Sequence, residues 1–384
     1  MNYRTLGRTG IKVSEIGLGS EAFVNQTVEY GVDLINAAID AGVNCFDLYN
    51  PEPYVRDAFG KAMEGRREKF VIQAHLCSAW IDGQYKRTRN MDEVKPAFAD
   101  LLGRLKTDYI DVGMIHYVDE QKDFDKVFGG PVIEFAKEQK AAGKIRHIGM
   151  STHNPRIGIQ AVKSGVVDVI MFSVNPAYDI VPPNENVDTL FEMSTYELPD
   201  VLSSTDPERQ ELYTLCESQG VAITVMKPYG GGALLKAEES PFGAAMTVNQ
   251  CLHYCLTRPG VATVLAGAHD REQLMEAVAY CNASNEERDY AKLLSSCPAH
   301  AFTDKCMYCG HCAPCTVGID IATVNKFADL CQAQDAVPET VREHYNALAV
   351  KAGDCIGCGR CEKRCPFGVK IVEHMQKAQS IFGE

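Results

Sequence analysis

Eight of the sixteen cysteines stand in two short runs whose spacing could hold metal clusters. In the downstream run three cysteines are separated by two residues each, and a fourth follows after three more and directly precedes Pro366. The upstream run repeats this pattern with two residues before its fourth cysteine. Thiolates at this spacing are typical of [4Fe–4S] cluster ligation. The runs are Cys306, Cys309, Cys312 and Cys315, and Cys355, Cys358, Cys361 and Cys365.

Zinc and disulfides are the alternatives for such cysteines. Zinc also binds Cys-x-x-Cys pairs, but the triple spacing, its repetition and the final Cys-Pro favour iron–sulfur clusters. The segment Met1–Gly19 lacks the charged and apolar regions of a signal peptide. We therefore expect a cytosolic, cytoplasmic protein with reduced thiols.

The repeat predicts two clusters whose fourth ligands are exchanged between the runs. Cys365 would complete the upstream set and Cys315 the downstream set, although Thr316 stands where the downstream run has a proline. The remaining cysteines lack ligand spacing, and we interpret them as small buried side chains. They are Cys45, Cys77, Cys216, Cys251, Cys255, Cys281, Cys297 and Cys331.

Composition argues against two kinds of partner. A formal net charge of −13 and a pI near 5.3 argue against nucleic acid. No apolar run approaches the ~18 residues that a membrane-spanning helix needs. A chain of 384 residues with 46% hydrophobic residues is long enough for one large and one small domain.

Strand-like and helix-like segments alternate along the chain, and this pattern predicts the fold that would position an active site. From Glu15 to Asn282, short β-branched runs alternate eight times with stretches of helical periodicity. Eight such units in about 270 residues predict an α/β protein with a (β/α)₈ TIM barrel. A doubly wound sheet is the alternative, but no Gly-x-Gly-x-x-Gly follows the first run. The predicted strands are Glu15–Gly19, Asn44–Asp47, Phe70–His75, Ile110–His116, His147–Ser151, Val169–Ser173, Ala222–Met226 and Thr263–Ala266.

Three further segments are distinctive. Tyr3–Val13 predicts a hairpin on the barrel floor. The proline-rich stretch Asn175–Pro207 is far longer than a usual βα loop and predicts a lid or a substrate wall on the catalytic face, with a disordered excursion as the alternative. Past Asn282 the alternation stops, so we predict a barrel over residues 1–285 and a small α-helical, ferredoxin-like domain over 286–384. Its predicted helices are Glu286–Leu294, about Ile321–Gln332, and about Pro338–Ala349.

Several segments together resemble the aldo-keto reductase family, and more narrowly its branch with a C-terminal ferredoxin-type extension. The resemblance implies a (β/α)₈ barrel that binds a nicotinamide cofactor across the strand C-termini and reduces carbonyls by hydride transfer. The segments are Tyr3–Gly19, Asp47 after the second predicted strand, Gly143–Ser151 and Met226–Leu234.

The family's tetrad is only half kept in this sequence. A tyrosine proton donor is assisted in the family by a lysine, an aspartate and a histidine. The resemblance places the aspartate on Asp47 and the histidine on His116, but the lysine position holds His75 and the tyrosine position holds Glu52. A tyrosine donates near neutral pH only if a cation lowers its pKa of about 10, and a histidine is a cation only while protonated.

Three interpretations of this altered site stay open. In the first, Tyr49 or Tyr54 replaces the missing proton donor. The alternative for each is a ring that only forms part of the wall of the substrate pocket. His116 and His75 act as acid and base next to a carbonyl. Two histidines with Asp47 hold a divalent metal ion, since such a set leaves open coordination positions. His153 and Glu52 are expected nearby.

The resemblance also implies the cofactor contacts. The family's phosphate-binding arginine falls on Gln273 and its adenine-side asparagine on Ala277. We therefore expect NAD(P)H binding without a strong preference for NADPH, with Arg271 as a substitute anchor. The remaining implied contacts are Ser151 and Asn175 at the carboxamide, and Lys227, Pro228, Gly230, Gly231 and Gly232 over the pyrophosphate.

Three functions follow, in order of preference. The first is an aldo-keto-reductase-type oxidoreductase acting on a carbonyl or alcohol, a small-molecule substrate, in the barrel mouth. Its electrons are able to pass to two clusters, and a redox protein is the expected partner. The second is a barrel repurposed for metal- or acid–base-assisted lyase, dehydratase or isomerase chemistry with structural clusters. The third is an electron-transfer protein whose barrel is a docking module.

Overall fold

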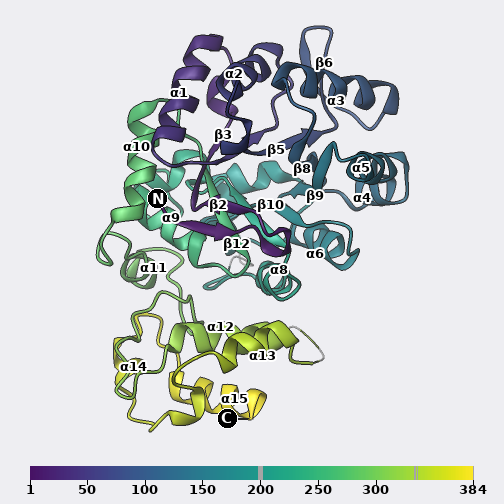
Figure 1. Cartoon of the computed structure of the whole chain (residues 1–384). Helices are drawn as coiled ribbons and strands as arrows, with labels where there is room; N and C mark the ends of the chain where they lie inside the picture. The colour runs from purple at the N-terminus through teal and green to yellow at the C-terminus, as the bar shows by residue number, and fades with distance from the viewer. Residues whose placement is uncertain (198–201, 333, 335, 384) are drawn as a thin grey trace.

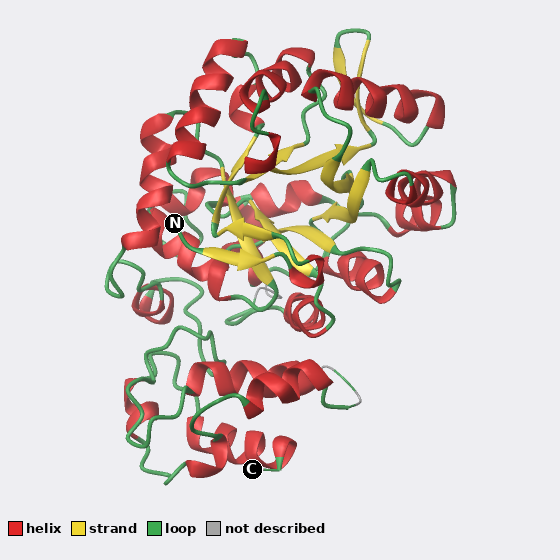
Figure 2. Ribbon diagram, viewed as in Figure 1, coloured by secondary structure: helices red, strands yellow, loops and turns green. Residues whose placement is uncertain are grey.

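A closed barrel forms the larger part of the molecule (Figures 1 and 2). The computed structural model describes residues 1–197, 202–332, 334 and 336–383, so residues 198–201 of the predicted long loop, Pro199 among them, lie outside the described residues. Within those ranges, eight strands pair in parallel around the barrel. They are β3 Ile16–Gly19, β4 Cys45–Leu48, β5 Val71–Leu76, β8 Ile110–Ile115, β9 Ile145–Thr152, β10 Val169–Ser173, β11 Ala222–Met226 and β12 Val261–Ala266.

The predicted barrel and its strands are confirmed, with small shifts at the ends. Strands β9 and β12 begin two residues earlier than predicted. Gly143 and Gly260 stand just before them at φ values of 74° and 77°, a region open to glycine, and turn the chain directly into each strand. Apart from residues near some strand ends, the barrel strands are buried, as expected for a parallel sheet covered by helices.

Helices cover the outside of the barrel. Val32, Ile35 and Ile39 recur at helical spacing and lie in α1, and Leu101 and Leu105 recur in the same way in α3. Among the described residues, no helix has both the length and the apolar character needed to cross a membrane. The outer helices are α1 Val28–Asp40, α2 Pro53–Met63, α3 Met91–Leu105, α4 Gln121–Phe128, α5 Pro131–Ala141, α6 Pro155–Lys163, α8 Pro207–Ser218, α9 Val248–Thr257 and α10 Arg271–Ala279.

The predicted N-terminal hairpin closes the barrel floor. Strands β1 (Tyr3–Thr5) and β2 (Lys12–Ser14) pair antiparallel. Buried Leu6 and Val13 pack with Val112 and Met171 of the barrel strands. The Arg8 backbone N–H donates to the Gly220 carbonyl at 2.6 Å, just before β11, which fixes the hairpin at the N-terminal end of the strands.

A second hairpin was not predicted from the sequence. Strands β6 (Ser78–Ile81) and β7 (Gln84–Arg87) pair antiparallel between β5 and α3. Asp82 and Gly83 turn the chain at φ values of 52° and 76°. Asp-Gly is a strong two-residue hairpin signal, so the sequence did contain the information.

The long loop after β10 has local structure of its own. It begins with α7 (Pro176–Asp179) and continues with 3₁₀ turns at Val187–Phe191 and Met193–Glu197. The Asn175 side chain starts α7 by accepting from the Tyr178 backbone N–H at 2.9 Å. The loop therefore returns over the barrel mouth in the parts that are described.

The C-terminal region is a helical lobe beside the barrel (Figure 1). The helix predicted from Glu286 to Leu294 begins only at Ala291, as α11, where the Asp289 carboxylate accepts from the Ala291 and Lys292 backbone N–H groups. Helix α12 has the predicted bounds, α13 is shorter than predicted, and two later helices were missed. The helices are α11 Ala291–Ser296, α12 Ile321–Gln332, α13 Glu339–Asn346, α14 Arg360–Arg364 and α15 Ile371–Phe382.

Polar contacts join this lobe to the barrel. Arg258, at the end of α9, is buried and donates to the Met307 carbonyl, which also accepts from the Tyr290 hydroxyl at 2.7 Å. Lys326 of α12 forms an ion pair of 2.7 Å with Glu217 of α8. The upstream cysteine run is thereby held directly against the barrel.

Candidate active site

A cavity of about 730 Å³ opens at the C-terminal ends of the barrel strands. Polar side chains reach it from four neighbouring ends: Asp47 in β4, His75 in β5, His116 just after β8 and Ser151 in β9. Active sites of such barrels form at this face, and the volume is that of a small-molecule site. Val187 and Phe191 of the long loop line one side, so the predicted loop does form a wall of the site.

Asp47, His75 and His116 form one hydrogen-bonded chain. His75 Nε2 lies 3.0 Å from Asp47 Oδ1, and His75 Nδ1 lies 2.6 Å from His116 Nδ1. All three side chains are buried. The three residues predicted at the site are therefore brought together, and in a linear order.

The chemistry of the partners fixes the direction of these hydrogen bonds. A carboxylate only accepts, so His75 carries its hydrogen on Nε2 and donates to Asp47. In the neutral ring His75 Nδ1 then accepts, and His116 donates from Nδ1. This leaves His116 Nε2 as an acceptor, with no hydrogen of its own.

Tyr85 of β7 supplies the donor for that nitrogen. Its hydroxyl lies 2.7 Å from His116 Nε2. The chain thus runs from Tyr85 through His116 and His75 to Asp47, and every member has a partner. The sequence analysis missed Tyr85 because it missed the hairpin that carries it.

Asp47 is also held in place by side chains from the barrel interior. Gln73 of β5 donates from Nε2 to Asp47 Oδ1 at 2.7 Å, and Thr224 of β11 donates to Gln73 Oε1 at 3.0 Å. Both side chains are buried inside the barrel. These contacts fix the carboxylate that orients His75, and no sequence motif marks them.

Burial lowers the pKa of His116 well below its usual value, and the neighbouring His75 lowers it further. Desolvation penalises the charged imidazolium, and a second histidine adds repulsion when both are protonated. At neutral pH His116 is therefore a neutral ring whose Nε2 accepts from the Tyr85 hydroxyl.

The two tyrosines named from the sequence lie in different places. Tyr49 lines the cavity and lies parallel to His116, with ring centroids 6.0 Å apart and an interplanar angle of 1°. Burial raises its pKa, so it is a poor proton donor at neutral pH. Tyr54 is not part of the cavity wall, and its hydroxyl accepts from the Asn25 backbone N–H at 3.0 Å. Glu52 is buried behind the wall, and its Oε2 has no hydrogen-bond partner among the described residues.

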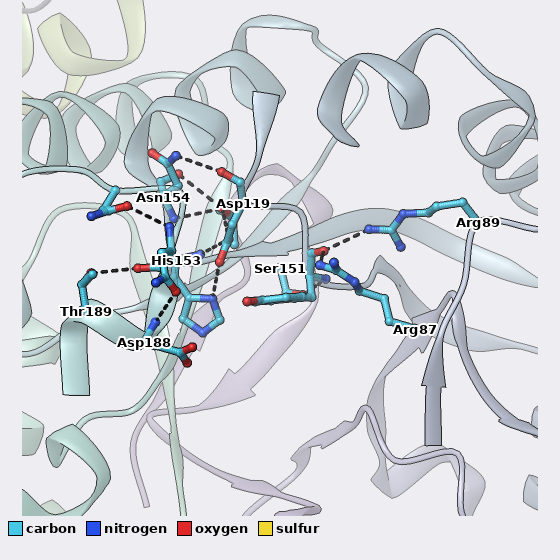
Figure 3. A network of polar contacts seen from close by, with 12 residues as sticks. Arg87, Arg89, Asp119, Ser151, His153, Asn154, Asp188 and Thr189 are labelled. Atoms are coloured by element: carbon cyan, nitrogen blue, oxygen red, sulfur yellow. Dashed lines mark hydrogen bonds and ion pairs between the residues drawn. The ribbon is translucent and has the colours of Figure 1, made fainter. Parts of the chain in front are cut away.

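His153 belongs to a separate polar network (Figure 3). Its Nδ1 lies 2.9 Å from Asp119 Oδ2, and Thr152 donates to the other oxygen of Asp119 at 2.8 Å. Burial opposes ionisation of Asp119, but the hydrogen bonds from His153 outweigh it and lower the pKa of Asp119. His153 lines the cavity beside Tyr117 without joining the Asp47 chain.

The loop from Lys227 to Gly232 exposes its backbone to the cavity. Lys227, Gly230, Gly231 and Gly232 all have positive φ values, between 59° and 98°. A Cβ placed on Gly231 or Gly232 would meet no atom within 4 Å, so these two positions border open space. The Gly230 and Gly232 backbone N–H groups donate within the loop, to the Lys227 and Tyr229 carbonyls at 3.0 Å each. The loop therefore allows close approach of a ligand to its backbone at Gly231 and Gly232.

The other predicted cofactor residues divide into two groups. Lys227, Pro228, Gly231 and Gly232 line the cavity together with Ser151, whose hydroxyl accepts from the Tyr117 backbone N–H at 2.7 Å. Gly230, Asn175 and Arg271 are not among the lining residues.

Asn175 and Gln273 are committed to the protein itself. Asn175 donates to the Lys227 carbonyl at 2.8 Å as well as capping α7. Gln273 lines the cavity, but its side-chain oxygen accepts from the His269 backbone N–H at 2.9 Å. Neither leaves its full hydrogen-bonding capacity for a cofactor.

The downstream cysteines meet Cys315 around a small hollow in the C-terminal lobe. Cys315, Cys355, Cys358 and Cys361 line it with apolar residues of α12 and α15. The Thr316 hydroxyl lies 3.5 Å from Cys358 Sγ. This is the set expected if the fourth ligand crosses over, and Thr316, which stands in place of a proline, lies against it.

The upstream cysteines lie with Cys365. Burial raises the pKa of Cys309 to about 11, and the nearby Cys365 thiol adds to the effect. Burial raises the pKa of Cys312 to about 12, with smaller contributions from Cys309, Cys361 and Cys365. Asn325 of α12 donates to Cys306 Sγ at 3.4 Å. The upstream cysteines and Cys365 therefore form a second group of thiols in the lobe.

Comparison with known proteins decides the family. The model of the aldo/keto reductase family matches residues 15–250, and that of a 4Fe-4S binding domain matches residues 349–370. The chain belongs to the aldo/keto reductase family. It also carries a 4Fe-4S binding domain, which contains the downstream cysteine run.

Relatives of this reductase agree with that assignment. The chain is 27% identical to the uncharacterized oxidoreductase YqkF of Bacillus subtilis over 77% of its own length and 96% of that protein. It is 24% identical to the NADH-specific methylglyoxal reductase of Escherichia coli over 74% and 94% of the two chains. The fold matches the holo form of aldo-keto reductase AKR11C1 from Bacillus halodurans with a TM-score of 0.58 and 23% identity, over 75% and 94% of the two chains.

The metal interpretation of this reductase's barrel site is not supported. The ring nitrogens of His75 and His116 face each other at 2.6 Å, and the second nitrogen of His75 faces Asp47. Among the described residues at the barrel mouth, no group of three or more His, Cys, Asp or Glu side chains is placed to hold a single metal ion. Their donor atoms bind each other and leave no common point for an ion.

Proposed function

We propose that this protein interconverts a small carbonyl compound and its alcohol at the barrel mouth, with a nicotinamide dinucleotide as the hydride carrier. The observation that carries the proposal is the Asp47–His75–His116 chain, which ends at a cavity bordered by the open Lys227–Gly232 loop. Proton-transfer groups and a glycine loop that a ligand can approach closely thus meet in one cavity.

The reaction needs one hydride and one proton. A nicotinamide held in this cavity would supply or accept the hydride at the carbonyl carbon. The alcohol oxygen gains or loses a proton, which the histidine pair handles. Because His116 is neutral at physiological pH, it is ready to take a proton when the alcohol is oxidised, and it returns the proton when the carbonyl is reduced.

Asp47 and His75 support this proton transfer. When His116 gains a proton, its Nδ1 hydrogen can pass toward His75 Nδ1, and the resulting positive charge is stabilised by Asp47. Gln73 and Thr224 hold Asp47 in place for this role. The pair replaces the lysine–tyrosine pair of the family without requiring a tyrosinate.

The substrate is expected to be small and partly apolar. The cavity must hold a dinucleotide as well, and its walls combine polar strand ends with Met171, Phe191 and Leu235. A relative named as a methylglyoxal reductase acts on a small dicarbonyl. Short aldehydes, ketones and α-dicarbonyls are therefore the class to test first.

The test is nucleotide-dependent turnover of that class by anaerobically purified holoprotein. We expect NADH or NADPH oxidation with at least one small aldehyde or dicarbonyl, and a loss of about 10²–10⁴ in turnover in His116→Ala. Absence of turnover across the panel, in protein that binds the dinucleotide, would contradict the proposal.

We further propose that two [4Fe–4S] clusters pass electrons between the barrel and a partner protein. Support comes from the surface of the downstream run, where Cys358 is exposed and Ile356 is 63% exposed. An exposed ligand beside an exposed apolar residue is suited to brief docking of a redox protein. Ile356→Asp should slow reduction of the clusters by a flavodoxin but not by dithionite, and equal slowing of both would count against a docking role.

A further inference from the structure

We propose that His153, held by Asp119, accepts a hydrogen bond from a substrate hydroxyl next to the carbonyl, so that this enzyme prefers α-hydroxy aldehydes and ketones. The inference rests on the proposed function and narrows its substrate class. It starts from a histidine that lines the cavity but that the Asp47–His75–His116 chain does not use.

Asp119 fixes the orientation of His153 through both of its carboxylate oxygens. Oδ1 accepts from the His153 backbone N–H at 2.7 Å and from the Thr152 hydroxyl at 2.8 Å, and Oδ2 lies 2.9 Å from His153 Nδ1. Asn154 donates to the Asp119 backbone carbonyl at 2.9 Å. Asp119 is buried, and its lowered pKa keeps the carboxylate ionised. The imidazole is therefore held in one position before any ligand binds.

The carboxylate also decides which nitrogen of His153 carries the hydrogen. A carboxylate only accepts, so Nδ1 donates to Asp119, and in the neutral ring Nε2 is an acceptor without a hydrogen. The hydrogen bonds of His153 within the described ranges are the two to Asp119, which leaves Nε2 without a partner from the protein. Figure 3 shows one ring nitrogen directed at Asp119 and the other directed away from it.

Tyr117 places this acceptor next to the proton chain. Its ring lies edge-on to His153 with centroids 5.4 Å apart, and it lies 6.2 Å from the His116 ring. All three side chains line the cavity. Both imidazoles therefore lie against the same tyrosine, and a small substrate bound for proton transfer with His116 presents its neighbouring substituent to His153.

A hydroxyl is the substituent that suits this position. Nε2 needs a donor from the ligand, and a carbonyl or a carboxylate has none. An ammonium group would bring a second positive charge beside the Arg87 guanidinium, which lies 4.4 Å from the centre of the Tyr117 ring. The His153 side chain is 13% exposed, so a ligand that fills the cavity removes its water and must replace that hydrogen bond.

The first test compares hydroxyacetone with butanone, which has a methyl group in place of the hydroxyl, in the wild-type holoprotein and in His153→Asn. The asparagine amide can still donate to Asp119 from the place of Nδ1 but has no atom at Nε2. We expect the wild type to prefer hydroxyacetone, and we expect the ratio of the two kcat/KM values to fall about tenfold in His153→Asn.

His147→Asn is the matched control. His147 lies on β9, directly before His153 along the barrel wall, and its Nδ1 faces Asp168 at 3.4 Å, but it does not line the cavity. Its ratio should stay at the wild-type value. A ratio in His153→Asn within twofold of the wild type would overturn the proposal, and so would a wild type that prefers aminoacetone to hydroxyacetone.

A second measurement needs no turnover and so separates this inference from the proposed function. The ring nitrogens of His153 are observed by ¹⁵N NMR in the holoprotein with NADH, before and after addition of 1,2-propanediol or 2-butanol. These alcohols correspond to the two ketones, and reduced nucleotide cannot oxidise them. We expect the hydrogen on Nδ1 in the free protein and a change at Nε2 with the diol alone.

The outcomes of the two measurements fall apart clearly. A neutral ring with its hydrogen on Nε2, or the same response to both alcohols, would overturn the inference even in a protein that reduces carbonyls. The expected response to the diol in a protein that reduces no carbonyl would support the hydroxyl contact and contradict the proposed function alone.

Discussion

At the scale of single residues, the family's catalytic lysine and tyrosine are replaced by His75 and Glu52, yet a continuous proton chain remains. The lysine position still contacts Asp47, at 3.0 Å, but through an imidazole that can be neutral. Glu52 is buried, does not line the cavity and takes no part in the proton chain. The proton chemistry therefore moves from a tyrosine–lysine pair to a pair of histidines.

This shift predicts the pH dependence of alcohol oxidation. His116 must be neutral to accept a proton, and burial lowers its pKa below 6.5. Activity should be constant through neutral pH and fall only as the pH drops through the lowered pKa, which lies further down than the transition at pH 6–7 expected from an ordinary histidine. The measurement is kcat/KM against pH, and a limb near pH 10 would point to a tyrosine instead.

Substitutions at the histidines and at the tyrosines distinguish a histidine from a tyrosine as the proton-transfer group. His75→Ala should lower turnover by about 10²–10⁴, as for His116→Ala. Tyr49→Phe and Tyr54→Phe should change it little, because each substitution deletes only a hydroxyl outside the chain. Collapse of activity in Tyr49→Phe with near-normal rates in His75→Ala would contradict the histidine mechanism.

Cofactor selectivity is also decided by single residues. Gln273 stands at the family's arginine position, and its oxygen is already bonded to the His269 backbone. We expect the wild type to bind NADH and NADPH with similar strength, and Gln273→Arg to favour NADPH by supplying a cation for its 2′-phosphate. Titration is the measurement. A hundredfold preference of the wild type for NADPH, about 2.7 kcal/mol, would contradict the expectation.

At the scale of elements, the Lys227–Gly232 loop is built for close approach of a ligand. Gly231 has a φ of 69° and borders the cavity, whereas Gly65, after α2, has a φ of 72° and also meets no atom within 4 Å. Alanine at either position should destabilise the fold by a similar ~1–2 kcal/mol, since both need the left-handed region. Only Gly231→Ala should weaken dinucleotide binding.

Equal effects of the two substitutions on binding would show that the loop does not contact the cofactor. The unfolding free energy of each variant is measured alongside its affinity, so that loss of fold is not mistaken for loss of a contact. Gly65 is suited as a control because it lies outside the residues that line the cavity.

The elements also show why some parts of the site were predictable and others were not. Asp47, His75 and His116 follow parallel strands, and the ends of such strands meet at one face, so their proximity follows from the pattern. Tyr85 comes from an inserted hairpin, and Gln73 and Thr224 meet across the barrel interior. Contacts of that kind depend on the closed barrel, not on local spacing. The hairpin itself was signalled by Asp82-Gly83.

In the C-terminal lobe the cysteine spacing predicted that Cys315 would lie with the downstream run, and these cysteines line one hollow. Helices α14 and α15 were missed. Helix α14 is only five residues long and lies inside the cysteine run, where ligand spacing obscures helical periodicity. The contact of the lobe with the barrel through Arg258 and Met307 joins residues 49 apart in sequence, and no motif marks it.

At the scale of the whole molecule, the account requires two clusters with exchanged fourth ligands. The anaerobic holoprotein should contain about eight iron atoms per chain. Cys315→Ser should reduce this toward four, because Cys315 lines the hollow with the downstream run. Cys281→Ser is the control, since the Cys281 thiol contacts the Met1 sulfur at 3.5 Å and lies in the barrel part of the chain. Zinc in place of iron, or four irons in the wild type, would contradict the two-cluster claim.

The central claim is hydride transfer at the barrel mouth, and isotope tracing tests it most directly. Anaerobic holoprotein is incubated with NADH carrying deuterium at C4 and with the small aldehydes and dicarbonyls proposed above, and the alcohols formed are analysed by mass spectrometry. The account predicts one deuterium on the former carbonyl carbon in the wild type, and a rate about 10²–10⁴ lower in His116→Ala. Product formed without deuterium, or no product from protein that binds NADH and holds its iron, would contradict it.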